Sequence, residues 1–89
     1  MKTIWKFRLF FKDTTTIEMP KDAQILCCQE QYDTPMMWAV VSPDAEKEKR
    51  TFILRETGHS MPDYPAKYIN TFQLKQLNLV FHLFEKEEN

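Results

Sequence analysis

The stretch Leu77-Asn78-Leu79-Val80-Phe81-His82-Leu83-Phe84 has the clearest secondary-structure pattern in the chain. Positions 77, 79, 81 and 83 are all leucine or phenylalanine, and this period of two is typical of a β-strand. The preceding segment, Tyr68 to Leu74, alternates in the same way. A helix over residues 68 to 84 is the alternative, because four apolar residues fall loosely at helical spacings. The strict alternation favours two strands.

Five earlier segments also read as strands. Ile4 to Phe11 has Trp5, Phe7, Leu9 and Phe11 on one face, and we expect it to form a hairpin with Thr14 to Met19 through a turn at Lys12-Asp13. Ala23 to Gln31 is apolar on both faces in its first half, which predicts a strand entering the centre of a sheet. Met36 to Val41 is apolar throughout and predicts a strand covered on both faces, and Arg50 to Arg55 follows a surface loop over residues 42 to 49.

The predicted fold is all-β: a small single-domain β-sandwich or open barrel of about six to seven short strands. Turn signals separate the strands, and there is no amphipathic helix of ten residues. With 89 residues, of which 43% are apolar, the chain suits one domain over residues 1–89. A sheet edge in such a fold can pair with a second copy, so a homo-oligomer is one expectation.

Charge and hydropathy argue against several classes of protein. The net charge is −1, whereas a dedicated nucleic-acid-binding domain is usually basic. Lys2, Lys6, Arg8 and Lys12 interleave with aromatic residues, a combination that can grip single strands, but alternation places the two kinds on opposite faces. Phe10 is the exception, on the basic face. The chain shows neither a signal peptide nor a membrane span, so we expect a cytoplasmic protein without membrane contact.

The cysteines and one histidine favour packing over chemistry. Cys27 and Cys28 are neighbours in a strand, where a bond between them would be strained, so we expect both to be reduced. His82 lies between apolar residues and is interpreted as a satisfied core or interface residue. None of the spacings resembles a zinc motif, and we expect neither a metal nor a cofactor.

The loop from Arg55 to Pro65 holds the only glycine and one of two histidines. Gly58 and Pro62 are assigned structural roles, with Gly58 supplying a positive φ. Arg55, His59, Met61 and Tyr64 are the candidate residues for binding a ligand or partner. Catalysis by His59 is the weakest hypothesis, because the chain has no nucleophile elbow, phosphate loop or paired metal motif. No catalytic residue is assigned.

Several segments resemble a family of short proteins of unknown function that phages and prophages encode. The most specific are the Thr-Gly-His-x-x-Pro loop at Thr57 to Pro62 and the ending from Phe72-Gln73-Leu74 to Leu79-Val80-Phe81-His82; the others are Met1 to Phe7, Thr16 to Pro20 and Trp38 to Val41. That family commonly has glycines between the last two strands, where this chain has Lys75-Gln76-Leu77-Asn78. A tight two-residue hairpin is therefore not expected there.

The resemblance implies a non-enzymatic accessory protein that binds a host protein, in counter-defence or host takeover, and acts in the bacterial cytoplasm. The alternative is a protein that sequesters a nucleotide-type signal, with Arg55, His59 and Tyr64 lining the pocket. A minor enzyme using His59 is the third hypothesis.

Overall fold

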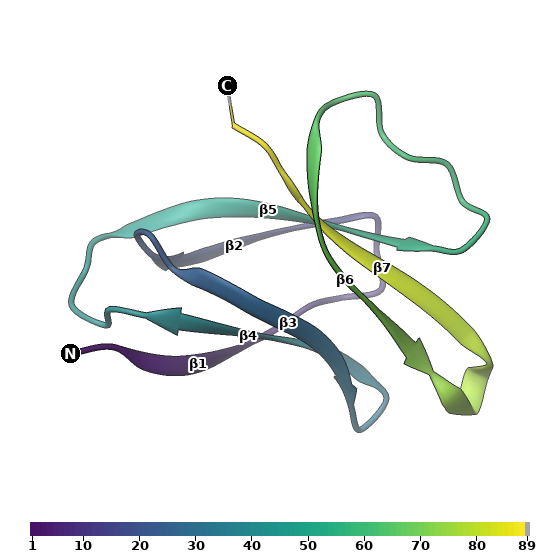
Figure 1. Ribbon diagram of the computed structural model, residues 1–89, viewed down its shortest axis with the longest axis horizontal. Coiled ribbons are helices and arrows are strands. Elements are labelled where there is room, and N and C mark those ends of the chain that lie inside the picture. The colour runs from purple at the N-terminus through teal and green to yellow at the C-terminus, as the bar shows by residue number, and fades with distance from the viewer. Residues whose placement is uncertain (89) are drawn as a thin grey trace.

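The computed structural model describes residues 1–88 and confirms an all-β fold (Figure 1). The elements in chain order are β1 Thr3–Arg8, β2 Thr14–Pro20, β3 Gln24–Gln31, β4 Thr34–Val41, β5 Lys47–Glu56, β6 Ala66–Leu74, the 3₁₀ turn η1 Lys75–Leu77, and β7 Leu79–Lys86. Alternation in the last third of the chain thus predicted β6 and β7 correctly. The loop before the fifth strand was predicted over residues 42 to 49. It covers residues 42 to 46, because β5 begins at Lys47.

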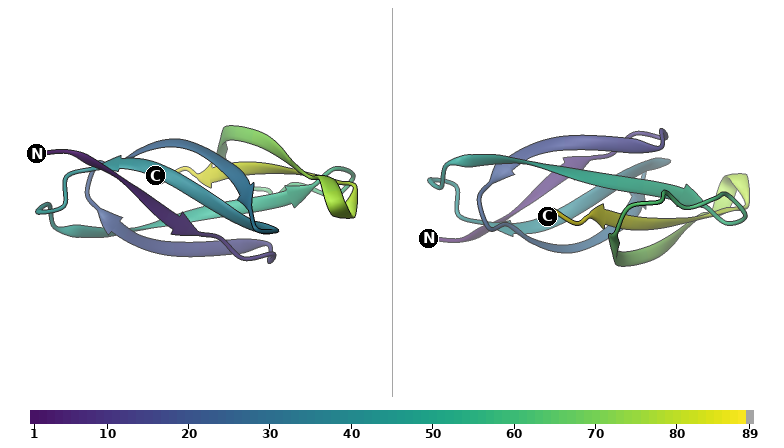
Figure 2. Two further views of the ribbon diagram at one scale, coloured as in Figure 1. Left: turned by 90° about the horizontal axis from the view of Figure 1, so that it is seen from below. Right: turned by 90° about the horizontal axis from the view of Figure 1, so that it is seen from above.

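The strands form two antiparallel sheets, in the orders β1-β4-β3 and β2-β5-β7-β6 (Figure 2). The predicted hairpin of the first two strands is wrong. β1 pairs with β4 and β2 pairs with β5, so residues 9–13 carry the chain from one sheet to the other. The two strands each have one apolar face, and such faces can lie side by side in one sheet or oppose each other across a core. Local alternation does not distinguish these arrangements.

The prediction that the third strand lies in the centre of a sheet is also wrong. β3 is an edge strand, and β4 is central between β1 and β3. Burial along β4 alternates strictly, with Pro35, Met37, Ala39 and Val41 buried and the residues between them half-buried, so only one of its faces is fully covered. Leu26, an apolar residue of β3, lies at a register shift between Ile25 and Cys27 and is 43% exposed.

Two short connections depend on left-handed backbone. Tyr32 and Asp33 join β3 to β4 with φ values of 55° and 60°, the conformation of a two-residue type I′ hairpin. Asn78, with φ 56°, ends η1 and leads into β7. The connection between β6 and β7 is therefore longer than a two-residue hairpin, and Leu77 lies in the 3₁₀ turn, 61% exposed, rather than in the strand.

The core lies between the two sheets. Its buried members are Leu9, Met19, Ala23, Cys28, Met37, Ala39, Val41, Phe52, Leu54, Phe72, Leu74, Phe81 and Leu83, with Trp5, Phe7 and Ile17 half-buried against them. Phe11 was expected to face this core. It is instead 51% exposed, because β1 ends at Arg8 and the crossover begins, and its ring lies 5.4 Å from that of Phe81.

The sheets meet along one side through β3 and β6. At a register shift in β6, Asn70 turns its side-chain amide toward β3. Its Oδ1 accepts a hydrogen bond from the Cys28 N–H at 2.8 Å, and its Nδ2 donates to the Cys28 carbonyl at 2.8 Å. The amide thus replaces one step of a backbone ladder. β1 and β2, at the opposite edges, do not pair with each other, so the two sheets are not joined there.

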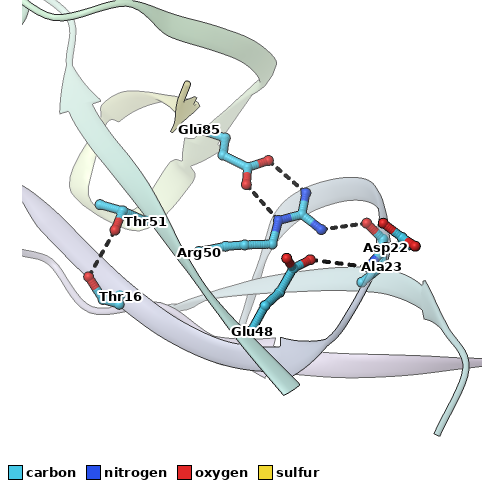
Figure 3. A network of polar contacts seen from close by, with 7 residues as sticks. All are labelled: Thr16, Asp22, Ala23, Glu48, Arg50, Thr51 and Glu85. Atoms are coloured by element: carbon cyan, nitrogen blue, oxygen red, sulfur yellow. Dashed lines mark hydrogen bonds and ion pairs between the residues drawn. The ribbon is translucent and has the colours of Figure 1, made fainter. Parts of the chain in front are cut away.

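A second link between the sheets is the Arg50 network (Figure 3). Arg50 of β5 donates to both carboxylate oxygens of Glu85 on β7, at 2.6 and 2.7 Å, and to the Ala23 carbonyl before β3 at 2.5 Å. The hydrogen bond to Glu85 raises the pKa of Arg50 above its ordinary value. Nearby, the Asp22 N–H donates to Glu48 at 3.1 Å. These bonds tie β5, β7 and the start of β3 together.

Candidate functional site

An apolar cleft of about 280 Å³ lies at the end of the molecule where the 9–13 crossover, the end of β5 and the β6–β7 connection meet. Its lining residues are Phe11, Lys12, Asp13, Leu54, Glu56, His59, Leu74, Leu77, Leu79 and Phe81. Six of these are leucine or phenylalanine, and the other four carry ionisable groups. The cleft therefore combines an apolar interior with charged groups.

Aromatic packing supports the cleft. The Phe81 ring stacks on Phe72 of β6, with centroids 6.0 Å apart and planes 22° apart. Phe11 packs against the same ring from the crossover, at 44°. Phe11 and Leu77 are 51% and 61% exposed, so the cleft offers two large apolar side chains to the solvent. Both are suited to contact a bound group.

The 57–65 loop begins with a tight turn beside this cleft. Gly58 has φ 98°, a conformation that L side chains rarely adopt, and the His59 N–H donates to the Glu56 carbonyl at 3.0 Å. The Thr57 N–H donates to the Val80 carbonyl at 3.1 Å, which fixes the start of the loop on β7. This turn is what places the imidazole of His59 at the cleft.

Arg55 holds the loop and the crossover together. Its side chain is only 14% exposed, and the guanidinium donates to the carbonyls of Ser60 at 2.9 Å and Asp13 at 3.0 Å. The Asp13 carboxylate lies 3.7 Å from the same group. Arg55, His59, Asp13 and Ser60 line a small polar hollow of about 220 Å³. The guanidinium is thus largely occupied by the protein's own oxygens.

The other candidate residues of the loop are spread over the surface. His59 is 62% exposed at its side chain, and its Nε2 lies 4.0 Å from a Glu56 carboxylate oxygen. Met61 is 46% exposed, whereas Tyr64 and Pro62 are half-buried, and the Lys86 ammonium lies 4.7 Å from the Tyr64 ring centroid. The structure brings His59 and Arg55 together at the hollow. Of the four predicted binding residues, His59 lines the apolar cleft.

Sequence reasoning missed Phe11 and Leu77 as surface residues of a site. Both were assigned to regular strand positions by extending the alternation two or three residues too far. The available signals were the turn residues beside them. Lys12-Asp13 follows Phe11, and Asn78, a residue that tolerates left-handed backbone, interrupts the pattern after Leu77.

A hydrogen-bonded row of polar side chains crosses the outer face of the four-stranded sheet. His82 contacts Thr57 Oγ1 through Nε2 at 2.8 Å and Thr71 Oγ1 through Nδ1 at 2.9 Å, and the Tyr68 hydroxyl lies 2.8 Å from the same Thr71 atom. Both ring nitrogens are therefore satisfied by hydroxyl groups. This arrangement orients the imidazole and anchors the start of the loop through Thr57.

The thiols are free and differ in burial. Cys28 is fully buried, and burial together with the neighbouring Cys27 raises the pKa of its thiol to about 12. The thiol stays protonated at neutral pH, which removes nucleophilic character. Within residues 1–88, no three His, Cys, Asp or Glu side chains are grouped as metal ligands would be. No helix in that range has the length and hydropathy needed to cross a membrane.

The fold and the cleft define a small antiparallel β domain of two sheets, open along the β1 and β2 edges. A family model described as a domain of unknown function (DUF7352) matches residues 1–89, and the chain belongs to that family. No curated protein and no solved structure matches the chain.

Proposed function

We propose that the protein is a non-enzymatic binding protein whose cleft receives an apolar side chain of a partner protein. The observation that carries this proposal is the pair Phe11 and Leu77, both more than half exposed beside an apolar interior. Large apolar side chains exposed around a depression, with charged groups at its margin, are typical of surfaces that bind other proteins.

The size of the cleft favours a single anchor. Its volume of about 280 Å³ lies just below the roughly 300 to 1,000 Å³ usual for small-molecule sites. One leucine, phenylalanine or tryptophan side chain fits that space. A few buried anchors of this kind supply most of the binding energy of protein interfaces. Lys12, Asp13, Glu56 and His59 would contact the backbone or polar groups of the partner around the anchor.

The occupancy of Arg55 weighs against the nucleotide-type alternative. Its Nε and Nη1 donate to the Ser60 and Asp13 carbonyls, a carboxylate lies 3.7 Å from Nη1, and the side chain is only 14% exposed, so the guanidinium presents few donors to a phosphate. The resemblance of the sequence supplies the biological setting of the proposal. In that setting the partner is a host protein, and the protein is a phage or prophage accessory factor acting in the bacterial cytoplasm, in counter-defence or host takeover.

The proposal is tested by photocrosslinking in bacterial cells. A photoreactive amino acid replaces Leu77 at the cleft, and in a matched control it replaces Tyr32, which is 92% exposed in the β3–β4 turn. We expect a discrete crosslinked protein from position 77 that position 32 does not give. A second substitution, Phe11→Ser, should remove that product while leaving the protein folded.

Equal labelling from both positions, or a product that survives Phe11→Ser, would contradict the proposal. A crosslinked species that forms only between copies of this chain would show instead that the cleft is an oligomer interface.

A further inference from the structure

β1 has a free backbone edge. It is the outermost strand of its sheet, and the Leu9 N–H donates to the Pro35 carbonyl at 2.9 Å. Backbone groups of an antiparallel strand point alternately toward and away from the partner strand. The backbone N–H of Leu9 points toward β4. By this alternation the N–H and C=O groups of Ile4, Lys6 and Arg8 point away from β4. Within residues 1–88 no strand pairs with these groups, and they form a row along the side where β1 and β2 stay apart.

Two of the three outward residues, Lys6 and Arg8, are basic and lack acidic partners. The first twelve residues hold four basic and no acidic residues, so the net charge of −1 divides into +4 over this segment and −5 over the remainder. Among residues 1–88, no carboxylate oxygen lies within 4.0 Å of the charged nitrogens of Lys2, Lys6, Arg8 and Lys12. Lys6 donates to the Gln31 side chain, and the Arg8 guanidinium lies 4.9 Å from the exposed ring of Phe10.

The other side of β1 faces the core but is incompletely covered. Trp5 and Phe7 are half-buried there, and so is Ile17 on β2. The edge of β2 is less suited than that of β1 to pairing with an added strand. The Leu54 N–H donates to the Asp13 carbonyl, so by the same alternation Thr16, Glu18 and Pro20 point outward, and proline has no N–H to offer.

We propose that the free edge of β1 binds an extended segment of a partner protein in which acidic and apolar side chains alternate. The added strand would pair with the outward backbone groups of Ile4, Lys6 and Arg8. Its acidic side chains would lie beside Lys6 and Arg8, and its apolar side chains would cover Trp5 and Phe7. Strand addition of this kind takes affinity from main-chain hydrogen bonds and specificity from alternate side chains.

This surface is distinct from the cleft, because none of the three edge residues lines it. A peptide strand also fits the edge better than a nucleic acid does. Phosphates would contact the same cations, but an oligonucleotide has no ladder of donors and acceptors with which to pair the backbone row. The two ligands are therefore separated by substitutions that alter the backbone and leave the charge unchanged.

The probe is a short capped peptide in which glutamate alternates with valine, compared with a peptide of the same composition whose glutamates are contiguous. Binding is followed by NMR and calorimetry at low and high salt. We expect the alternating peptide to bind, to slow amide exchange at positions 4, 6 and 8, and to bind more weakly as salt increases. The contiguous peptide should bind at least several-fold more weakly.

Two pairs of variants separate charge from backbone pairing. Lys6→Glu/Arg8→Glu should abolish binding, whereas Lys21→Glu/Lys75→Glu, which changes the net charge equally at exposed sites, should leave it unchanged. Ile4→Pro and Ile4→Ala both remove an exposed side chain, but only proline removes the outward N–H. We expect Ile4→Pro to bind roughly three- to tenfold more weakly than Ile4→Ala, the worth of one hydrogen bond.

Three outcomes would overturn the proposal. One is the absence of binding at millimolar peptide, which would mean that the basic residues only protect the edge from aggregation. Another is equal affinity of Ile4→Pro and Ile4→Ala. The third is preferential binding of a single-stranded oligonucleotide that Lys6→Glu/Arg8→Glu abolishes and Ile4→Pro does not affect.

Discussion

Replacing Asn70 should weaken the junction of β3 and β6, along which the two sheets meet. In Asn70→Ala, the Cys28 N–H and C=O lose both of their partners, each at 2.8 Å. Two hydrogen bonds are worth about 1 kcal/mol each, and a buried group left unsatisfied costs about 1 to 3 kcal/mol. Cys28 is 0% exposed, so water has no direct access to replace the bonds. We expect the free energy of unfolding to fall by about 2 to 4 kcal/mol.

The assay is equilibrium denaturation followed by tryptophan fluorescence, which reports on Trp5 and Trp38 in β1 and β4. Gln73→Ala, at an exposed position of the same strand, is the matched control and should change stability by less than about 0.5 kcal/mol. Asn70→Asp keeps the acceptor but loses the donor, so its loss should be at least half that of Asn70→Ala. Equal stability of Asn70→Ala and Gln73→Ala would refute the role of this bridge.

Three further substitutions test the remaining structural claims. Glu85→Gln should lower the free energy of unfolding by about 1 to 2 kcal/mol in urea denaturation, because it leaves the partly buried Arg50 without its charged partner; no change would show that solvent screens the pair. Gly58→Ala should cost about 1 to 2 kcal/mol in thermal unfolding, since no atom lies near the added Cβ and the strain is that of φ 98°; an unchanged melting temperature would contradict this. The raised pKa of Cys28 means that the unfolded chain loses this proton from pH 9.0 upward while the folded protein holds it to about 12. Stability should therefore fall with rising pH in this window by about 1 kcal/mol per pH unit more in the wild type than in Cys28→Ala, and parallel pH profiles would argue against a buried, protonated thiol.

The sequence predicted the fold class because alternation is a local signal. Several strands carry a period of two that is visible within eight residues of sequence, as in β7 and β1. Pairing is not local. β1 finds β4 and β2 finds β5, and nothing in their own residues distinguishes that arrangement from a hairpin.

Only part of the candidate site was predicted, again because local patterns are visible in the sequence and contacts between distant segments are not. Gly58 and its neighbours marked the loop, and His59 does line the cleft. The apolar interior comes from Leu54, Leu79 and Phe81, which look like ordinary core residues in the sequence. Their contribution depends on where β1 ends and on the 3₁₀ turn at Leu77, which bring segments distant in the sequence to one cleft.

Amide chemical-shift mapping with capped phenylalanine and leucine amides tests the binding cleft most directly. We expect saturable shifts confined to the cleft, at residues such as Leu54, His59 and Leu79, and weaker binding to Leu77→Asp than to Tyr32→Asp. Shifts that are spread over the surface without saturation, or equal binding to both variants, would contradict it.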